Sequence, residues 1–502
     1  MEQLNSTEQY STEVFVPGRF EREFDLPLAG GIIRVRAVSE DCVFYDENGE
    51  PEASLFVQAY LRTDAPGAVG FTVSDPDCVV NRRPVMFLWN GGPGSSSAAL
   101  QLECFGPLTM TGTPGAGPGG KEAVFDPDCI LDAVDLVYID QAGVGWSRLL
   151  KKDKAAKYYS VDGDARAYAF CIMKWLSNHG RLFSPVYLCG ESYGTVRACR
   201  VVAELGRSPF SESRMVPGLP PAGVILVGNA TSMCPDGKSA GGGLLEPGLE
   251  LTAAAMPAMA ATHYYHHSGS FDTDAQQTFI DEAWEFVRKE MTPAWFAGTS
   301  LPEEERNELA ARLEHFTGLP ADYWLSHALK LASEEDFLTG VCAPEGLRCD
   351  LYDTRKTSPL TGAYNAIGGG ENVPLKLMNT AVRSLQGTDN ARLYYTGNLT
   401  CYPLWNFATE DLPSGRRTHL ECLSDAMNEN PEMRVLFASG LYDLCTHAGN
   451  TRYQLMHGNL PMCRVTAREY AGGHGVYSSP EGKKAFLSDV REFIADAERE
   501  RK

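Results

Sequence analysis

The chain has 502 residues, 43% of them hydrophobic, and a formal net charge of −21, which fits a folded protein with a large core. The negative charge argues against nucleic acid or an anionic membrane surface as a partner. The sequence has no run near the roughly 20 apolar residues that span a bilayer, and its N-terminus lacks the basic start and apolar stretch of a secretion signal.

The 14 cysteines are scattered and form no short paired motifs. Buried free thiols are ordinary in reducing compartments. We therefore predict mostly free cysteines and a cytoplasmic protein, with a secreted form as the alternative if the sequence has been trimmed.

The predicted elements change in character along the chain. After a polar lead-in at 1–19, alternating apolar and polar residues at 32–38 and 53–61 predict antiparallel strands. From residue 85 onwards, apolar runs alternate with helical segments, which predicts a mainly parallel sheet covered on both faces. The expected strands are 85–89, 135–140, 185–189, 223–228, 434–440 and 465–470, and the expected helices are 165–178, 195–205 and 481–498.

The sequence Gly190-Glu191-Ser192-Tyr193-Gly194 lies between an expected strand and an expected helix. A Gly-x-Ser-x-Gly motif at such a junction is typical of the nucleophile elbow of α/β-hydrolases, in which a tight turn exposes the serine hydroxyl. The following helix directs its N-terminal dipole toward the same place. We therefore predict Ser192 as a nucleophile on an α/β-hydrolase fold.

Between residues 245 and 365 the pattern becomes helical, with apolar spacing typical of helices at 275–290, 303–315 and 321–332. This segment is predicted to be a helical cap inserted into the sheet domain. The expected domains are the lead-in at 1–19, core parts at 20–244 and 366–502, and the cap at 245–365.

A serine nucleophile needs a base that is oriented by a carboxylate, and in α/β-hydrolases the acid and the base follow the serine in the sequence. Asp443 comes soon after the expected strand 434–440, and His474 comes between the last strand and the last helix. We predict these two residues as acid and base. His447 and His457 are the nearest competitors, but their segment favours roles on a helix.

A second motif, Asn90-Gly91-Gly92-Pro93-Gly94, directly follows the expected strand 85–89. Such a loop can turn backbone N–H groups toward a developing oxyanion. We predict the N–H groups of Gly92 and Tyr193 as the two donors. A phosphate-binding loop is disfavoured because the motif lacks the Gly-Lys-Ser/Thr ending.

These motifs resemble those of serine carboxypeptidases of the carboxypeptidase Y type. The resemblance rests on the stretches 90–97, 105–107, 135–147, 190–194 and 228–230, and Ser95–Ser97, Arg197 and Leu351–Arg355 resemble the bacterial branch of the family. It implies release of the C-terminal residue of a peptide that has a free C-terminus. It also implies that Asn90, Gly91 and a protonated Glu191 bind the substrate carboxylate.

Two departures from the family pattern are visible. The family's second carboxylate-binding glutamate is matched only by Glu103, which is one residue out of register and competes with Cys104 for the position. Ser95 stands where well-known members have a disulfide cysteine, in keeping with a reducing environment. Two roles are left as alternatives for Arg197: a cation near the site, or a partner in a structural ion pair.

Two other kinds of function are compatible with the same residues. An esterase or acyltransferase would use the same triad, and a non-catalytic binding protein could keep the same fold. The run His263-Tyr264-Tyr265-His266-His267 is interpreted as aromatic packing, and Cys342 and Cys349 as too isolated for zinc. We therefore expect no metal and no cofactor.

Overall fold

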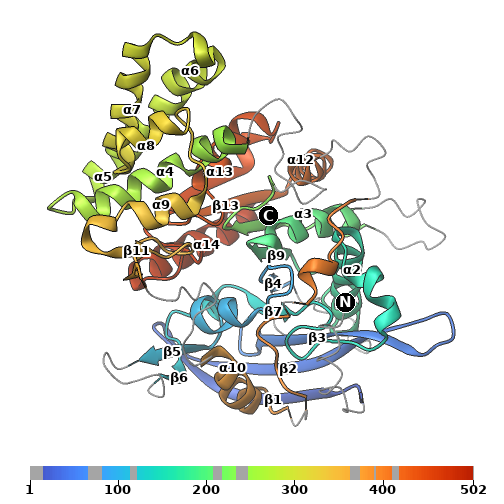
Figure 1. The fold of residues 1–502 in the computed structure, drawn as a ribbon. Coiled ribbons are helices and arrows are strands. Elements are labelled where there is room, and N and C mark those ends of the chain that lie inside the picture. Colours follow the sequence, from blue (N-terminus) through green and yellow to red (C-terminus); the bar gives the residue numbers. More distant parts are fainter. Residues whose placement is uncertain are drawn as a thin grey trace. The chain divides into compact units, whose positions relative to one another are not determined.

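The computed structural model describes residues 15–65, 82–112, 121–206, 218–232, 247–361, 373–388, 392–398, 400–409 and 418–500. Contacts divide the chain into two units, Met1–Tyr187 with Glu371–Asn406, and Leu188–Gly370 with Phe407–Lys502. Each unit is described by itself (Figure 1). Most of the predicted lead-in and the expected cap boundaries near 245 and 365 lie outside the described residues.

The first unit is built on a mixed sheet with the strand order β1–β2–β3–β7–β4, and β8 pairs with β3. β1, β2, β3 and β7 are antiparallel neighbours, whereas β4 and β7 are parallel. The strands are β1 (Arg19–Leu28), β2 (Gly31–Tyr45), β3 (Pro51–Arg62), β4 (Val85–Trp89), β5 (Leu108–Gly112), β6 (Lys121–Phe125), β7 (Asp135–Ile139) and β8 (Arg148–Leu149). The helices are α1 (Ala155–Tyr158), α2 (Val161–Asn178), α10 (Val373–Leu377) and α11 (Arg383–Gln386).

Aromatic side chains join the distant segment 371–406 to the rest of the first unit. The Trp146 ring packs edge-on against Phe56, with centroids 5.3 Å apart, and against Tyr394, with centroids 4.9 Å apart. All three rings are fully buried. This cluster explains why residues from the second half of the chain belong to the first unit.

The second unit has the strand order β9–β10–β13–β14, and the pairs β10–β13 and β13–β14 are parallel. All five residues of β10 are buried, as expected for a strand covered on both faces. The strands are β9 (Val186–Glu191, which begins in the first unit), β10 (Gly223–Val227), β11 (Leu347–Cys349), β12 (Thr357–Pro359), β13 (Arg434–Gly440) and β14 (Val465–Tyr470). The helices outside residues 247–340 are α3 (Tyr193–Leu205), α12 (His419–Glu429), α13 (Ala448–His457) and α14 (Pro480–Glu500).

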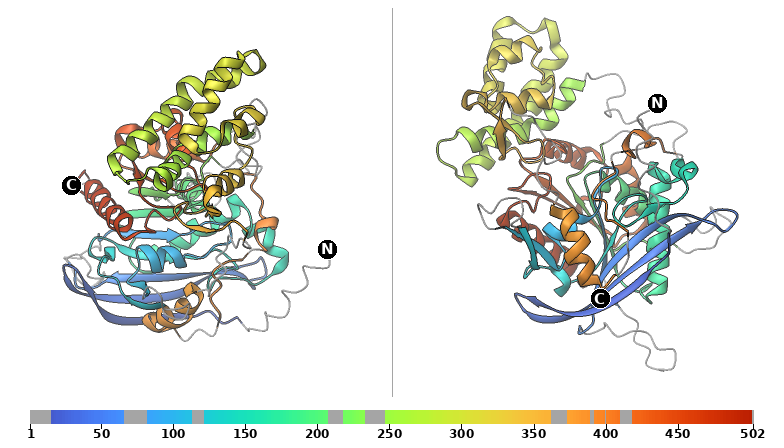
Figure 2. Two further views of the ribbon diagram at one scale, coloured as in Figure 1. Left: turned by 60° about the vertical axis from the view of Figure 1, so that its left-hand side comes forward. Right: turned by 60° about the horizontal axis from the view of Figure 1, so that its bottom comes forward.

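Residues 247–340 form a bundle of helices around one buried apolar core, seen in green to yellow in Figure 2. The helices are α4 (Pro247–His267), α5 (Thr273–Phe286), α6 (Thr292–Ala297), α7 (Glu303–Thr317), α8 (Ala321–Ser326) and α9 (Glu334–Gly340). None of the helices in the described ranges is both long and apolar enough to cross a bilayer.

The predicted helix 321–332 is wrong in its second half, because α8 ends at Ser326. Ala328 and Leu329 have φ angles of 53° and 60°, which a right-handed helix does not allow. The Leu329 side chain is nevertheless buried in the core of the bundle. Leu329 is therefore apolar because it is buried in a turn, and not because it lies on the buried face of a helix.

Candidate active site

Ser192 lies at the sharp turn between β9 and α3, as the Gly-x-Ser-x-Gly motif predicts. Its φ of 60° and ψ of −129° are uncommon for a residue with a side chain. The turn is held by a hydrogen bond from Ser192 N to Val227 O (2.9 Å), and by Thr195, whose N and Oγ1 donate to Ser192 O at 2.8 and 2.7 Å. The strained conformation is thus imposed by its neighbours, and the serine stays partly exposed.

Asp443 is completely buried in the loop after β13. Its Oδ1 accepts hydrogen bonds from Cys445 N (2.7 Å) and Thr446 N (3.0 Å), and its Oδ2 accepts from the Thr446 hydroxyl. Oδ2 also lies 2.9 Å from His474 Nδ1. Burial raises the pKa of Asp443, but the charge and hydrogen bond of His474, together with the bonds from Thr446, bring the pKa below its ordinary value.

His474 lies in the loop between β14 and α14, where the sequence places the base. Burial lowers its pKa, but the charge and hydrogen bond of Asp443 and the charge of Glu191 outweigh this effect and raise the pKa to about 8. Because Nδ1 is bonded to Asp443, Nε2 is the nitrogen that faces away from the acid. This is the tautomer that a general base requires.

The end of β10 brings the serine and the histidine to the same place. Val227 O holds the backbone of Ser192, and the next residue, Gly228, lies against the His474 ring. A Cβ atom added at Gly228 would be 3.3 Å from two ring atoms of His474 and 2.9 Å from Thr446 Oγ1. Gly228 also has a φ of +57°, so space and conformation both favour glycine here.

The loops that carry the acid and the base are joined through their backbones. Leu441 N donates to Tyr470 O (3.0 Å), and Tyr442 N donates to Gly472 O (3.0 Å). A Cβ atom at Gly440 would lie only 2.0 Å from Gly473 O. No side chain therefore fits between the two loops at this point.

The segment Leu351–Arg355 braces both of these loops. Leu351 O accepts from Leu444 N (3.2 Å), and Tyr352 O accepts from His474 N (2.6 Å). Arg355 forms two hydrogen bonds of 2.8 Å with the buried Asp353 and a third of 2.8 Å with Ala471 O. The position of His474 therefore depends on a segment that lies about 120 residues earlier in the chain.

Glu191, which precedes the nucleophile, is buried. Its Oε2 accepts a hydrogen bond from the Tyr477 hydroxyl at 2.5 Å. Tyr477 follows His474 by three residues in the same loop. Glu191 is thus linked to the loop of the base, and its charge acts on His474 as described above.

The other candidate residues, Asn90, Gly91, Gly92 and Glu103, belong to the first unit. Asn90 directly follows β4 and is buried, with Oδ1 accepting from Leu100 N at 3.3 Å. Gly92 is exposed and has a φ of +105°, so its loop adopts a conformation that favours glycine. Glu103 is half-buried in the helical turn Leu100–Cys104.

Tyr193 is the first residue of α3, where backbone N–H groups and the helix dipole favour negative charge. Ser192 N donates to Val227 O. The role of the Tyr193 N–H as an oxyanion donor stays a prediction. Arg197 is buried, with its guanidinium 5.4 Å from the centre of the Tyr193 ring. It lies on the same helix as Tyr193, four residues further along.

Sequence reasoning missed three residues of this site: Thr446, Gly228 and Tyr477. Thr446 follows Asp443 by three residues, a spacing at which a hydroxyl often bonds to an aspartate in a turn, so a local signal existed. Gly228 and Tyr477 act through contacts with residues remote in the chain. No local pattern could have indicated those contacts.

Comparison with known proteins agrees with the resemblance seen in the sequence. Residues 72–208 match the family model described as serine carboxypeptidase. This segment includes the elbow and the glycine-rich loop, but not Asp443 or His474. No curated protein sequence gives a significant match.

Among solved structures, the chain is similar to Kex1ΔP, a prohormone-processing carboxypeptidase from Saccharomyces cerevisiae. The TM-score is 0.56 and the sequence identity is 11%, and the match covers 92% of this chain and 91% of that one. Proline iminopeptidase from Mycobacterium smegmatis is a more distant match, with a TM-score of 0.36 and 11% identity over 96% and 100% of the two chains. The Kex1ΔP match and the mostly parallel sheet with helices confirm the α/β-hydrolase fold. The similarity to the serine carboxypeptidase family therefore rests on residues 72–208.

Proposed function

We propose that the protein is a serine carboxypeptidase that releases the C-terminal residue of peptides through an acyl-enzyme on Ser192. The observation that carries the proposal is the hydrogen bond between buried Asp443 and His474, formed in the same unit as the strained serine elbow. The family match supports the substrate class, because it covers the elbow and the glycine-rich loop.

In this mechanism His474 Nε2 takes the proton of the Ser192 hydroxyl as Oγ attacks the carbonyl carbon of the last peptide bond. Asp443 stabilises the imidazolium that forms. His474 then gives the proton to the departing amine nitrogen, the C–N bond breaks, and the terminal amino acid leaves. Water attacks the ester in the same way, and the proton returns to Ser192. The N–H groups of Gly92 and Tyr193 are the proposed oxyanion donors.

Recognition of the substrate's terminal carboxylate is assigned to Asn90, Gly91 and Glu191, with Glu103 as a further candidate. Two carboxyl groups in contact cannot both be ionised cheaply, so Glu191 and the substrate would share one proton. Peptide binding should then weaken as the pH rises from roughly 5 to 8. A KM for a peptide acid that stays constant over this range would remove Glu191 from the role.

The deciding experiment compares an N-blocked dipeptide with its C-terminal amide, and measures the release of the free terminal residue. Cleavage of the acid alone, lost in Ser192→Ala, is the expected result. If neither compound is cleaved and a simple acyl ester is still hydrolysed through Ser192, the function is that of an esterase or acyltransferase. A protein inactive on all three would be a binding protein on the same fold.

We further propose that the protein works in a reducing compartment, and the free state of the described cysteines supports this. Ten of these twelve side chains are buried. Thiol titration of the denatured, unreduced protein tests this: all 14 cysteines should react, and a shortfall in pairs would indicate disulfides and a secreted protein.

A further inference from the structure

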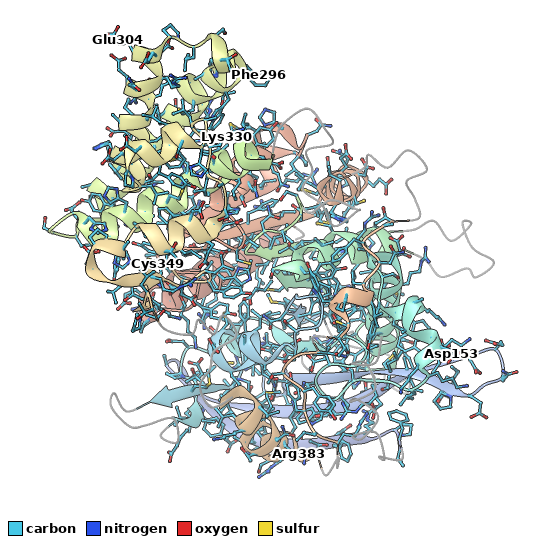
Figure 3. All side chains as sticks on the ribbon, viewed as in Figure 1. Asp153, Phe296, Glu304, Lys330, Cys349 and Arg383 are labelled. Carbon is cyan, nitrogen blue, oxygen red and sulfur yellow. The ribbon has the colours of Figure 1, made fainter. Side chains whose placement is uncertain are left out.

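Four polar side chains from three segments of the second unit meet beside the end of α4. His266 and His267 end α4, Cys342 lies between α9 and β11, and Cys349 is the last residue of β11. Figure 3 labels Cys349. One nitrogen of His266 and both sulfur atoms lie within 4.8 Å of one another. His267 and Glu345 form a second such group with Cys342. The interpretation of this region as aromatic packing alone is therefore incomplete.

The distances fit a tetrahedral metal ion. Sγ of Cys342 lies 3.8 Å from Sγ of Cys349, and this second sulfur lies 3.8 Å from Nε2 of His266. Two thiolates bound to zinc at about 2.3 Å in a tetrahedron lie about 3.8 Å apart, and a thiolate and an imidazole lie about 3.6 Å apart. A disulfide would need the two sulfur atoms at about 2.0 Å.

Backbone carbonyls lie beside both histidines. His267 Nε2 is 2.9 Å from Val341 O, which fixes the tautomer and leaves Nδ1 as the nitrogen that can bind metal. His266 Nε2, the nitrogen that lies near Cys349 Sγ, is 2.8 Å from Thr354 O. Metal binding at this nitrogen would replace its hydrogen bond to Thr354 O.

The chemistry of the donors selects the metal. Both cysteines are buried. Thiolate and imidazole together favour Zn²⁺ over the hard cations Mg²⁺ and Ca²⁺. His267 and the exposed Glu345 both lie near Cys342, and either one completes four protein ligands.

We propose that Cys342, Cys349 and His266 bind one structural zinc ion, with the fourth position filled by His267 or Glu345. A site closed by four protein ligands leaves no position for substrate, which makes its role structural. The site lies next to the segment that braces Asp443 and His474, because Thr354, whose carbonyl lies beside His266, donates from its N to Tyr442 O at 3.0 Å.

The first test is metal analysis of the full-length protein, purified with a phosphine reductant and without chelators, then equilibrated with zinc and washed. We expect close to one zinc per chain in the wild type, and at least a tenfold lower content in Cys342→Ser and Cys349→Ser. Cys463→Ser is the matched control, because this exposed cysteine lies outside the cluster and should leave the zinc content unchanged. Equal zinc in the wild type and the two cluster variants would overturn the proposal.

A second test does not depend on the folding of variants. Cobalt replaces zinc in the wild-type protein, and two thiolate ligands would give an intense sulfur-to-cobalt charge-transfer band in the near ultraviolet. Absence of this band would refute thiolate ligation. Peptide mapping of the protein purified without reductant is the third readout, since a Cys342–Cys349 disulfide in a zinc-free protein would show that the pair is a redox bridge.

Discussion

Asp443 shows how a single buried carboxylate can set the chemistry of a site. Its two oxygens receive four hydrogen bonds, from two backbone N–H groups, a hydroxyl and an imidazole. Such a carboxylate keeps its charge although it is fully buried. The charge in turn makes His474 a stronger base than a free histidine.

Replacing Asp443 with Asn is therefore expected to lower kcat by about three to four orders of magnitude, because the amide stabilises the wrong imidazole tautomer. The general base works when deprotonated, so activity falls below its pKa of about 8. Without the aspartate charge, burial lowers that pKa, and the acidic limb of the kcat profile should move to lower pH. Stopped assays with an acyl ester measure both effects.

The matched control is Asp489→Asn, since Asp489 bonds to the Tyr470 hydroxyl in the same unit but does not contact His474. It should leave kcat within a few-fold of the wild type. An Asp443→Asn variant that keeps full activity would show that Asp443 is not the acid of this site.

Glu191→Gln tests the second charge that acts on His474. Removing this charge should lower the pKa of His474 from about 8 and shift the acidic limb of kcat toward lower pH, because Glu191 raises the pKa in the wild type. An ester without a free carboxylate is the substrate of choice, because it separates this effect from carboxylate recognition. Glu481→Gln changes the net charge equally from an exposed position, and should not move the profile.

At the scale of elements, the acid and base loops have no room between them. Gly440→Ala places a methyl group 2.0 Å from Gly473 O, so the loops must separate. We expect a loss of about 1–3 kcal/mol in the free energy of unfolding, together with a clear fall in kcat. Chemical denaturation and ester kinetics give the two quantities.

Gly30→Ala is the comparison, because a Cβ at Gly30 meets nothing within 4 Å. This variant should be nearly as stable and as active as the wild type. If Gly440→Ala keeps the stability and the kcat of Gly30→Ala, the close approach of the two loops is not required for folding or activity.

At the scale of the whole molecule, a buried ion pair joins two distant segments of the first unit. Arg392 forms two hydrogen bonds, of 3.0 and 2.7 Å, with the fully buried carboxylate of Asp41 on β2. Arg392→Met leaves this charge without its cation, which should cost about 3–5 kcal/mol of unfolding free energy. The exposed pair Arg34–Asp25 is the control, and Arg34→Met should cost no more than about 1 kcal/mol. Equal losses in the two variants would contradict this account.

The sequence indicated most of the regular elements, because buried strands and the elbow carry strong local patterns. The expected strands at 85–89, 135–140, 223–228 and 434–440 all have counterparts in the structure. The helix predicted at 321–332 failed because apolar residues in a turn can be buried as deeply as those on a helix. An apolar pattern therefore does not distinguish a buried turn from a buried helix.

The candidate site was indicated only in part. Ser192, Asp443 and His474 follow a known order along the chain, so local reading could place them. The brace at Leu351–Arg355 and the cysteine–histidine cluster depend on contacts between segments far apart in the sequence. Cys349 is 83 residues from His266, and no short spacing reveals such a pair.

The end of β10 has one more consequence. Val227 O accepts a hydrogen bond from the backbone of the serine, and Gly228 lies against the ring of the histidine, so two adjacent residues contact both partners of the proposed proton transfer. A substitution that displaces the end of this strand is therefore expected to disturb the nucleophile and the base together, even though it touches neither side chain's own loop.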